Sequence, residues 1–95
     1  MAAYVVVDIE VLEPVEYEEY KVLAAPTVAA YGGRYVARGG TVEVLEGDWI
    51  PNRLVVLEFP TVAQAQAWWA SPEYGPAKAI RQRTASTNMV LVAGV

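Results

Sequence analysis

Six polar or aromatic side chains are candidates for transferring a proton or binding a small anion. Asp8 interrupts a run of β-branched residues in the middle of an expected strand, a position that carboxylates disfavour. A sheltered carboxylate can act as a general acid or base, and a nearby arginine can hold an anion. Asp8 is therefore the candidate catalytic residue, and the candidate ligand-binding residues are Arg38, Glu58, Arg34, Asn88 and Trp49.

The same residues also have a purely structural interpretation. Asp8 or Glu58 can form an ion pair with Arg38 across neighbouring strands and so fix the register of a sheet. Trp49 lies in a turn-rich loop over residues 47–52, where it either inserts into a neighbouring subunit or lines the mouth of a pocket. The residue types alone leave both interpretations open.

The chain contains neither cysteine nor histidine. This excludes disulfides, thiolate nucleophiles and imidazole bases, and it removes the commonest protein ligands of transition metals and haem. We therefore expect no cofactor and no metal.

The net charge of −4 is unevenly distributed, with six acidic residues and one lysine in residues 1–33. Residues 34–95 hold five acidic and six basic residues, and no basic stripe of the kind that binds nucleic acid is visible. Lys78, Arg81 and Arg83 are interpreted as the solvated end of a helix, where cations complement the dipole. No apolar run is long enough to span a membrane and no signal peptide is visible, so we expect a cytoplasmic protein.

Hydrophobic periodicity and turn residues predict the elements that must position these side chains. Strands are predicted over 4–11, 34–38, 53–59 and 87–93, with the second continuing after a bend at Gly39-Gly40 through residues 41–46. A helix follows Pro14, a second follows a capping box of Thr61 and Gln64, and a third follows Ser71-Pro72. This order predicts one α+β domain over residues 1–95, a ferredoxin-like βαββαβ sandwich with a four-stranded antiparallel sheet and helices on one face.

The predicted strands have one apolar face and one mixed face. The apolar face, expected under the helices, carries Val5, Val7, Ile9, Tyr35, Ala37, Val55, Leu57, Phe59, Met89 and Leu91. The mixed face carries all the candidate strand residues together with valines and a leucine. An uncovered sheet with this much apolar surface is typical of an interface, and hydrophobic residues make up 55% of the chain. We therefore expect a homodimer with the open faces turned toward each other.

Several short motifs together resemble domain-of-unknown-function family 1330 over nearly the whole chain. They are Tyr-Gly-Gly-Arg-Tyr at 31–35, Arg-Gly-Gly at 38–40, Leu-Glu-Gly-Asp-Trp at 45–49, Leu-Glu-Phe-Pro at 57–60, and Ser-Pro-Glu-Tyr at 71–74 with Arg81. The resemblance implies a ferredoxin-like protomer of the dimeric α+β-barrel superfamily, mostly bacterial and cytoplasmic, with no established activity. Its relatives include cofactor-free monooxygenases, lactone isomerases and haem enzymes, whose histidine-dependent chemistry this chain cannot perform. Gly75-Pro76 departs from the regular helix expected there and leaves the start of the third helix open.

Two functions are consistent with these residues. One is a homodimeric α+β barrel that binds or transforms a small, partly apolar metabolite without metal or haem, with Asp8 transferring a proton and Arg38 holding an anion. The other is a non-catalytic dimeric module whose polar inner residues only set register. A small-molecule ligand and a second copy of the chain are the expected partners, and nucleic acid and membrane are not.

Overall fold

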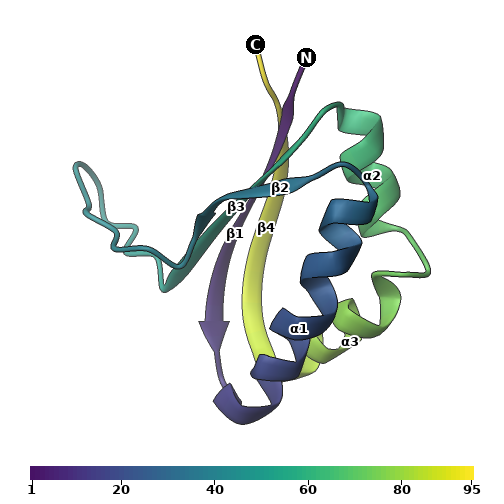
Figure 1. Cartoon of the computed structure of the whole chain (residues 1–95). Coiled ribbons are helices and arrows are strands. Elements are labelled where there is room, and N and C mark those ends of the chain that lie inside the picture. Colours follow the sequence, from purple (N-terminus) through teal and green to yellow (C-terminus); the bar gives the residue numbers. More distant parts are fainter.

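The computed structural model describes all residues, 1–95, as a sheet with three helices packed on one side (Figure 1). In chain order the elements are β1 (Ala3–Val11), α1 (Pro14–Ala30), β2 (Arg34–Arg38), β3 (Arg53–Phe59), α2 (Val62–Trp69), α3 (Gly75–Thr84) and β4 (Ala85–Ala93). The strand order in the sheet is β2-β3-β1-β4, and each neighbouring pair is antiparallel. This confirms the ferredoxin-like βαββαβ arrangement with an uncovered sheet face.

The core lies between the sheet and the helices and follows the predicted alternation. Val5, Val7 and Ile9 of β1 are buried, while the residues between them are partly exposed. Phe59 packs on Trp68 of α2 with ring centroids 5.4 Å apart, and Trp68 packs on Tyr74 at 4.2 Å. Trp69, next to Trp68 on α2, is exposed beneath the ammonium group of Lys78, because adjacent helical residues point about 100° apart.

The predicted helix-start signals are present. The hydroxyl of Thr61 accepts a hydrogen bond of 3.1 Å from the Gln64 amide, which forms one half of a capping box. The hydroxyl of Ser71 accepts one of 3.1 Å from the Tyr74 amide, and α3 then begins at Gly75 with Pro76 in its first turn. Residues 72–74 form a turn, so α3 begins at Gly75 and not directly after Pro72. This settles the start of the third helix, which the Gly75-Pro76 pair had left open.

The prediction of a strand over residues 41–46 is wrong. Residues 39–52 form a loop that extends away from the helices, on the opposite side of the sheet (Figure 1). Gly39 takes a left-handed φ of +69°, which turns the chain out of β2. β3 begins at Arg53, only two residues before Val55, the partner of Arg38, so the alternating sequence that follows β2 has no strand beside it with which to pair.

A bulge in β2 changes which residues lie under the helices. Tyr35 is opposite Leu57, but the register then shifts so that Ala37 is opposite Val56 and Arg38 is opposite Val55. The extra residue is Val36. Since residues paired across strands share a face, Ala37 moves to the open face and Arg38 to the helix-covered face. The expectation that Arg38 shares the open face with Arg34 and Asp8 is therefore wrong.

Candidate functional site

Glu58 is the centre of one polar group on the open face. Its carboxylate accepts hydrogen bonds from Arg34 Nε at 2.8 Å and from the Tyr4 hydroxyl at 3.0 Å. These two bonds, Arg34 first, hold the pKa of Glu58 below its usual range, and the bond to Glu58 raises the pKa of Tyr4. The group fixes the pairing of β2, β3 and β1, since Arg34 and Tyr4 both lie opposite Glu58 in register.

Asp8 is the centre of a second group on the same face. Its two carboxylate oxygens accept hydrogen bonds of 2.9 Å from Trp49 Nε1 and from the backbone amide of Asn52. Asp8 therefore holds the projecting loop against the sheet. Asn88 lies opposite Asp8 in the β1–β4 register, and both line an open hollow of about 260 Å³ with Val6, Trp49 and Val90. Trp49 contacts its own chain here, yet 60% of its surface stays exposed.

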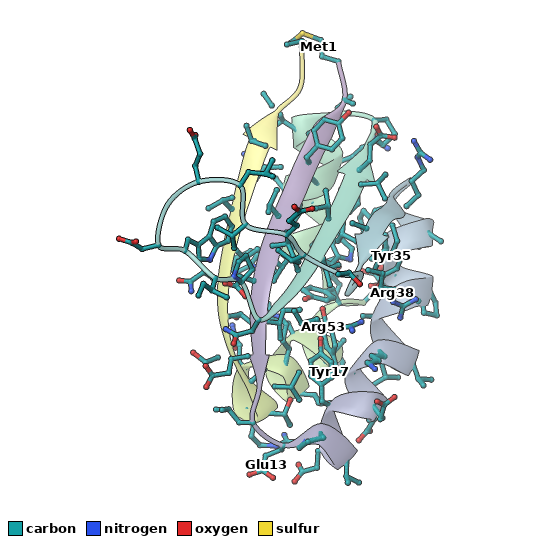
Figure 2. The ribbon with its side chains drawn as sticks, turned by 90° about the vertical axis from the view of Figure 1, so that its left-hand side faces the viewer. Met1, Glu13, Tyr17, Tyr35, Arg38 and Arg53 are labelled. Atoms are coloured by element: carbon teal, nitrogen blue, oxygen red, sulfur yellow. The ribbon has the colours of Figure 1, made fainter.

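A different set of polar side chains meets on the helix-covered side of the sheet, beside the edge strand β2, and Arg38 among them is exposed to solvent. We call it the arginine–tyrosine cluster, and its members are Tyr17, Tyr20, Tyr35, Arg38 and Arg53. Lys21, whose ammonium group pairs with Glu18, lines the same space. Figure 2 shows Tyr17, Tyr35, Arg38 and Arg53 gathered beside α1. The Arg38 guanidinium carbon lies 4.3 Å from the centre of the Tyr35 ring. The cluster encloses a space of about 20 Å³, which is room for one water-sized group.

Arg53 enters this cluster because it alternates in phase with the buried residues Val55 and Leu57. Its Nε is buried and has no hydrogen-bond partner, which is rare for a buried polar atom. Its guanidinium packs directly on Gly39, where a Cβ atom would overlap it. The glycine thus serves both the left-handed turn and the placement of Arg53.

Arg38 and Arg53 have no carboxylate to balance their charge. The ion pairs of the chain are Lys21–Glu18, Arg34–Glu58 and Arg83–Glu16. Burial raises the pKa of both Tyr17 and Tyr35, although the nearby positive charges of Arg53 and Arg38 oppose the rise. Burial also raises the pKa of Tyr20. The phenols are therefore neutral near pH 7, and the cluster carries a net positive charge that an anion would balance.

Arg81 adds a third cation without a carboxylate behind the cluster. It is only 3% exposed, so its interpretation as a solvated helix end is wrong. Arg81 Nε donates to the Tyr74 hydroxyl at 3.3 Å, and Nη1 donates to the Thr87 hydroxyl. The Tyr74 hydroxyl is in turn 3.0 Å from that of Tyr20. Arg81 is thereby connected to the cluster through two phenols.

An apolar groove of about 380 Å³ opens between α2 and the edge strand β4. Its lining residues are Val5, Ala65, Gln66, Trp68, Trp69, Ala70, Met89, Val90 and Leu91. Trp68 and Met89 also line the arginine–tyrosine cluster. The groove and the cluster are therefore neighbouring spaces separated by two side chains.

The structure thus divides the sequence-predicted site residues between two faces. Asp8, Arg34, Glu58, Asn88 and Trp49 belong to the open face and to its loop, while Arg38 joins residues that were not predicted. Two signals could have found some of those residues. Arg53 has the phase of the apolar row in its strand. Arg81 lies four residues after Ala77 and three before Thr84, spacings that place all three on one helix face. Tyr17 and Tyr20 carry no such signal, because an aromatic residue in an otherwise apolar helical stripe indicates packing.

No group of three or more carboxylate, histidine or cysteine side chains in this chain is placed to hold a metal ion. None of the helices has the length and apolar character needed to cross a membrane.

A family model matches the sequence of this chain, and solved structures match its fold. The model of the family described as "Domain of unknown function (DUF1330)" matches residues 2–95. No curated protein matches the chain. A protein of unknown function from Rhodopseudomonas palustris has a similar structure, with a TM-score of 0.78 and 18% identity over 99% of this chain and 82% of that one. SnoaB, a cofactor-independent oxygenase from Streptomyces nogalater, has a TM-score of 0.67 and 15% identity over 99% of this chain and 93% of that one. At these identities the likeness shows a shared fold.

Proposed function

The chain belongs to the DUF1330 family, a domain of unknown function, and we propose that it is a homodimeric α+β-barrel protein that binds a small, partly apolar organic anion. The anionic group is held by Arg38 and Arg53 of the arginine–tyrosine cluster. The apolar part contacts the surrounding aromatic and aliphatic side chains. Binding, and any reaction that follows it, needs no metal or haem.

The observation that carries this proposal is the buried, unpartnered Nε of Arg53 beside a second arginine with no carboxylate. Burying the Arg53 Nε–H away from water is costly unless an acceptor compensates it. The chain supplies no acidic side chain to this cluster, and the phenols nearby are neutral. A bound carboxylate or enolate would supply both the charge and the hydrogen-bond acceptor.

The proposal includes no cofactor, and one protein with the same fold supports this choice. SnoaB, which shares the fold, is described as a cofactor-independent oxygenase. Its activity belongs to that protein. It nevertheless supports the view that this fold can serve an enzyme that uses no cofactor.

The homodimer is supported by apolar surface on the open face and on the projecting loop. Val36, Val90 and Val92 are exposed on or beside the sheet, and Leu45 and Ile50 are exposed on the loop. Such a patch, outside the core, is typical of an interface. Light scattering at micromolar concentration should give about twice the mass of one chain. A monomer under those conditions would contradict this part of the proposal.

Trp49 is the expected anchor of that interface, because it stays largely exposed while its indole N–H is held by Asp8. Trp49→Ala should weaken dimerisation by about 2 kcal/mol, as loss of a hot-spot aromatic does. Analytical ultracentrifugation over a dilution series measures this change. The matched control is Trp69→Ala, an exposed tryptophan on the helix side, which should leave the dimer unchanged.

A second candidate function, a non-catalytic dimeric module, is favoured by the hydrogen bonds of the open face. Glu58 is held by Arg34 and Tyr4, and both oxygens of Asp8 are held by the projecting loop. These contacts fix the register and the loop, which are structural roles. If Asp8 is catalytic, its carboxylate must exchange one of these donors for a substrate.

Anion binding can be tested with acetate and with its neutral isostere acetamide. Acetate should raise the melting temperature and shift the NMR signal of the Arg53 Nε–H, whereas acetamide should do neither. Arg53→Gln should abolish the acetate response. Arg83→Gln, which removes an exposed arginine of α3, should preserve it. Equal responses to acetate and acetamide, or an unchanged response in Arg53→Gln, would contradict the proposal.

A further inference from the structure

The hydrogen-bond directions behind the arginine–tyrosine cluster can be assigned from its donors. Arg81 can only donate, so the Tyr74 hydroxyl oxygen accepts its Nε–H at 3.3 Å. Tyr74 is completely buried, and the one further polar atom within hydrogen-bond distance of its hydroxyl is the Tyr20 hydroxyl, at 3.0 Å. The Tyr74 proton is satisfied only if Tyr74 donates to Tyr20.

This direction leaves the Tyr20 proton without an acceptor, since Tyr74 is the only partner of its hydroxyl. Tyr20 lines the enclosed space together with Arg38 and Arg53, and the proposal below assigns its free O–H to that space. Hydrogen bonds in a chain polarise one another, and the Arg81 cation at the far end strengthens the donor at the near end. The cluster therefore presents two guanidinium groups and one oriented phenol, all of them donors.

The enclosed space accepts only a small group. At about 20 Å³ it matches a single oxygen or water, which is too little for a whole metabolite. The adjacent groove of about 380 Å³ lies in the usual range for small-molecule sites, about 300–1,000 Å³. Eight of its nine lining residues are hydrophobic. A ligand that filled both spaces would have an oxygen anion at one end and an apolar body at the other.

The wall between the two spaces can open. Trp68 and Met89 line both of them, and Met89 is half-buried on the edge strand β4. A methionine side chain is unbranched and has several rotatable bonds, so it changes conformation at little cost. Met89 is therefore the side chain whose rotation a ligand that fills both spaces would require.

We propose that the groove and the arginine–tyrosine cluster form one bipartite site for an organic acid or enol with an aryl or alkyl body. Tyr20, Arg38 and Arg53 bind the oxyanion, and the groove lined by Trp68, Met89 and Leu91 binds the body. Arg81 and Tyr74 are positioning residues that orient the Tyr20 proton. This proposal rests on the proposed function, because it requires the cluster to bind an anion, and it adds the chemical class of the ligand.

The ligand class can be tested by calorimetry with acetate, phenylacetate, 3-phenylpropionate and 4-phenylbutyrate, together with 4-phenylbutanol as a neutral control. The best phenyl acid should bind about tenfold or more tightly than acetate, because it also buries an aromatic ring. The alcohol should bind more weakly than the matching acid.

If the phenyl acids bind no more tightly than acetate, the bipartite site is wrong while the proposed anion site stands. If acetate and the phenyl acids all fail to bind, the proposed function itself is wrong.

Two pairs of variants locate the two halves of the site. Ala70→Phe fills the groove from an exposed position and should remove the advantage of the phenyl acids without affecting acetate. Ala67→Phe, at an exposed position of α2 outside the groove, should bind like the wild type. Tyr20→Phe should weaken binding of every acid about tenfold, as loss of a hydrogen bond to a charged group does. Tyr31→Phe, which removes an exposed hydroxyl bonded to Glu73, should not. Unchanged acid binding in Tyr20→Phe, or an unchanged phenyl preference in Ala70→Phe, would overturn the assignment.

Discussion

At the residue scale, Asp8, which the sequence singles out, and Arg53, which it does not, have different surroundings in the structure. Asp8 has both carboxylate oxygens satisfied by its own chain, through Trp49 and Asn52. Arg53 has a buried nitrogen that its own chain leaves unsatisfied. An unsatisfied buried donor that persists in a folded protein indicates an external partner more strongly than a satisfied one does, because folding alone disfavours it.

Asp8→Asn should lower the free energy of unfolding by about 1–3 kcal/mol, since a neutral amide cannot accept from both Trp49 Nε1 and the Asn52 amide with charge assistance. Chemical denaturation of both proteins measures the difference. Asn88→Asp serves as the control for charge at the neighbouring position in the register. Unchanged or increased stability of Asp8→Asn would favour a catalytic role for the carboxylate over the structural one.

At the element scale, the bulge at Val36 and the turn at Gly39 together assemble the arginine–tyrosine cluster. The bulge moves Arg38 to the helix-covered face, and the left-handed turn sends the chain out of β2 beside Arg53. The amide of Gly39 still donates to the Leu54 carbonyl at 2.9 Å, so the end of β2 stays attached to β3. A regular β2 would have left only one of the two arginines under the helices.

Gly39→Ala should destabilise the fold by about 1 kcal/mol or more, because its left-handed backbone and the packed Arg53 guanidinium both exclude a Cβ atom. It should also displace Arg53 and reduce the acetate response. Gly40→Ala is the matched control, since a Cβ there meets nothing within 4 Å. Equal melting temperatures for the two variants would show that Gly39 places no constraint on Arg53.

At the scale of the whole molecule, one sheet separates two polar environments. The helix-covered side holds three arginines without carboxylates and several neutral phenols. The open side holds paired carboxylates and an exposed apolar surface, which is the surface proposed to meet a second copy. An anion bound under the helices and a partner bound on the open face would therefore stabilise opposite sides of the same sheet.

The buried phenols predict that the protein loses stability above about pH 10, the ordinary pKa of tyrosine. Burial raises the folded-state pKa of Tyr17, Tyr20 and Tyr35, so the folded chain retains protons that the unfolded chain releases. Stability is therefore unaffected by these groups below that pH and falls as the pH rises through the unfolded value toward the folded ones. Denaturation followed from pH 8 to 11, with phenolate absorbance, measures the effect. Reversible ionisation of all six tyrosines in the folded protein would contradict it.

The sequence by itself determined the order of the elements, the buried strand row and the open sheet face. These features follow from local periodicity, from Pro14, Thr61 and Ser71 at the helix starts, and from the family motifs. Only the tertiary structure decided which polar residues meet. The side chains of a strand alternate between faces, so a single inserted residue at Val36 reverses the face of Arg38, and the sequence does not mark that insertion. The cluster of Arg53 with Tyr17 and Tyr20 also depends on packing between α1 and β3, which local patterns cannot specify because the contact joins distant parts of the chain.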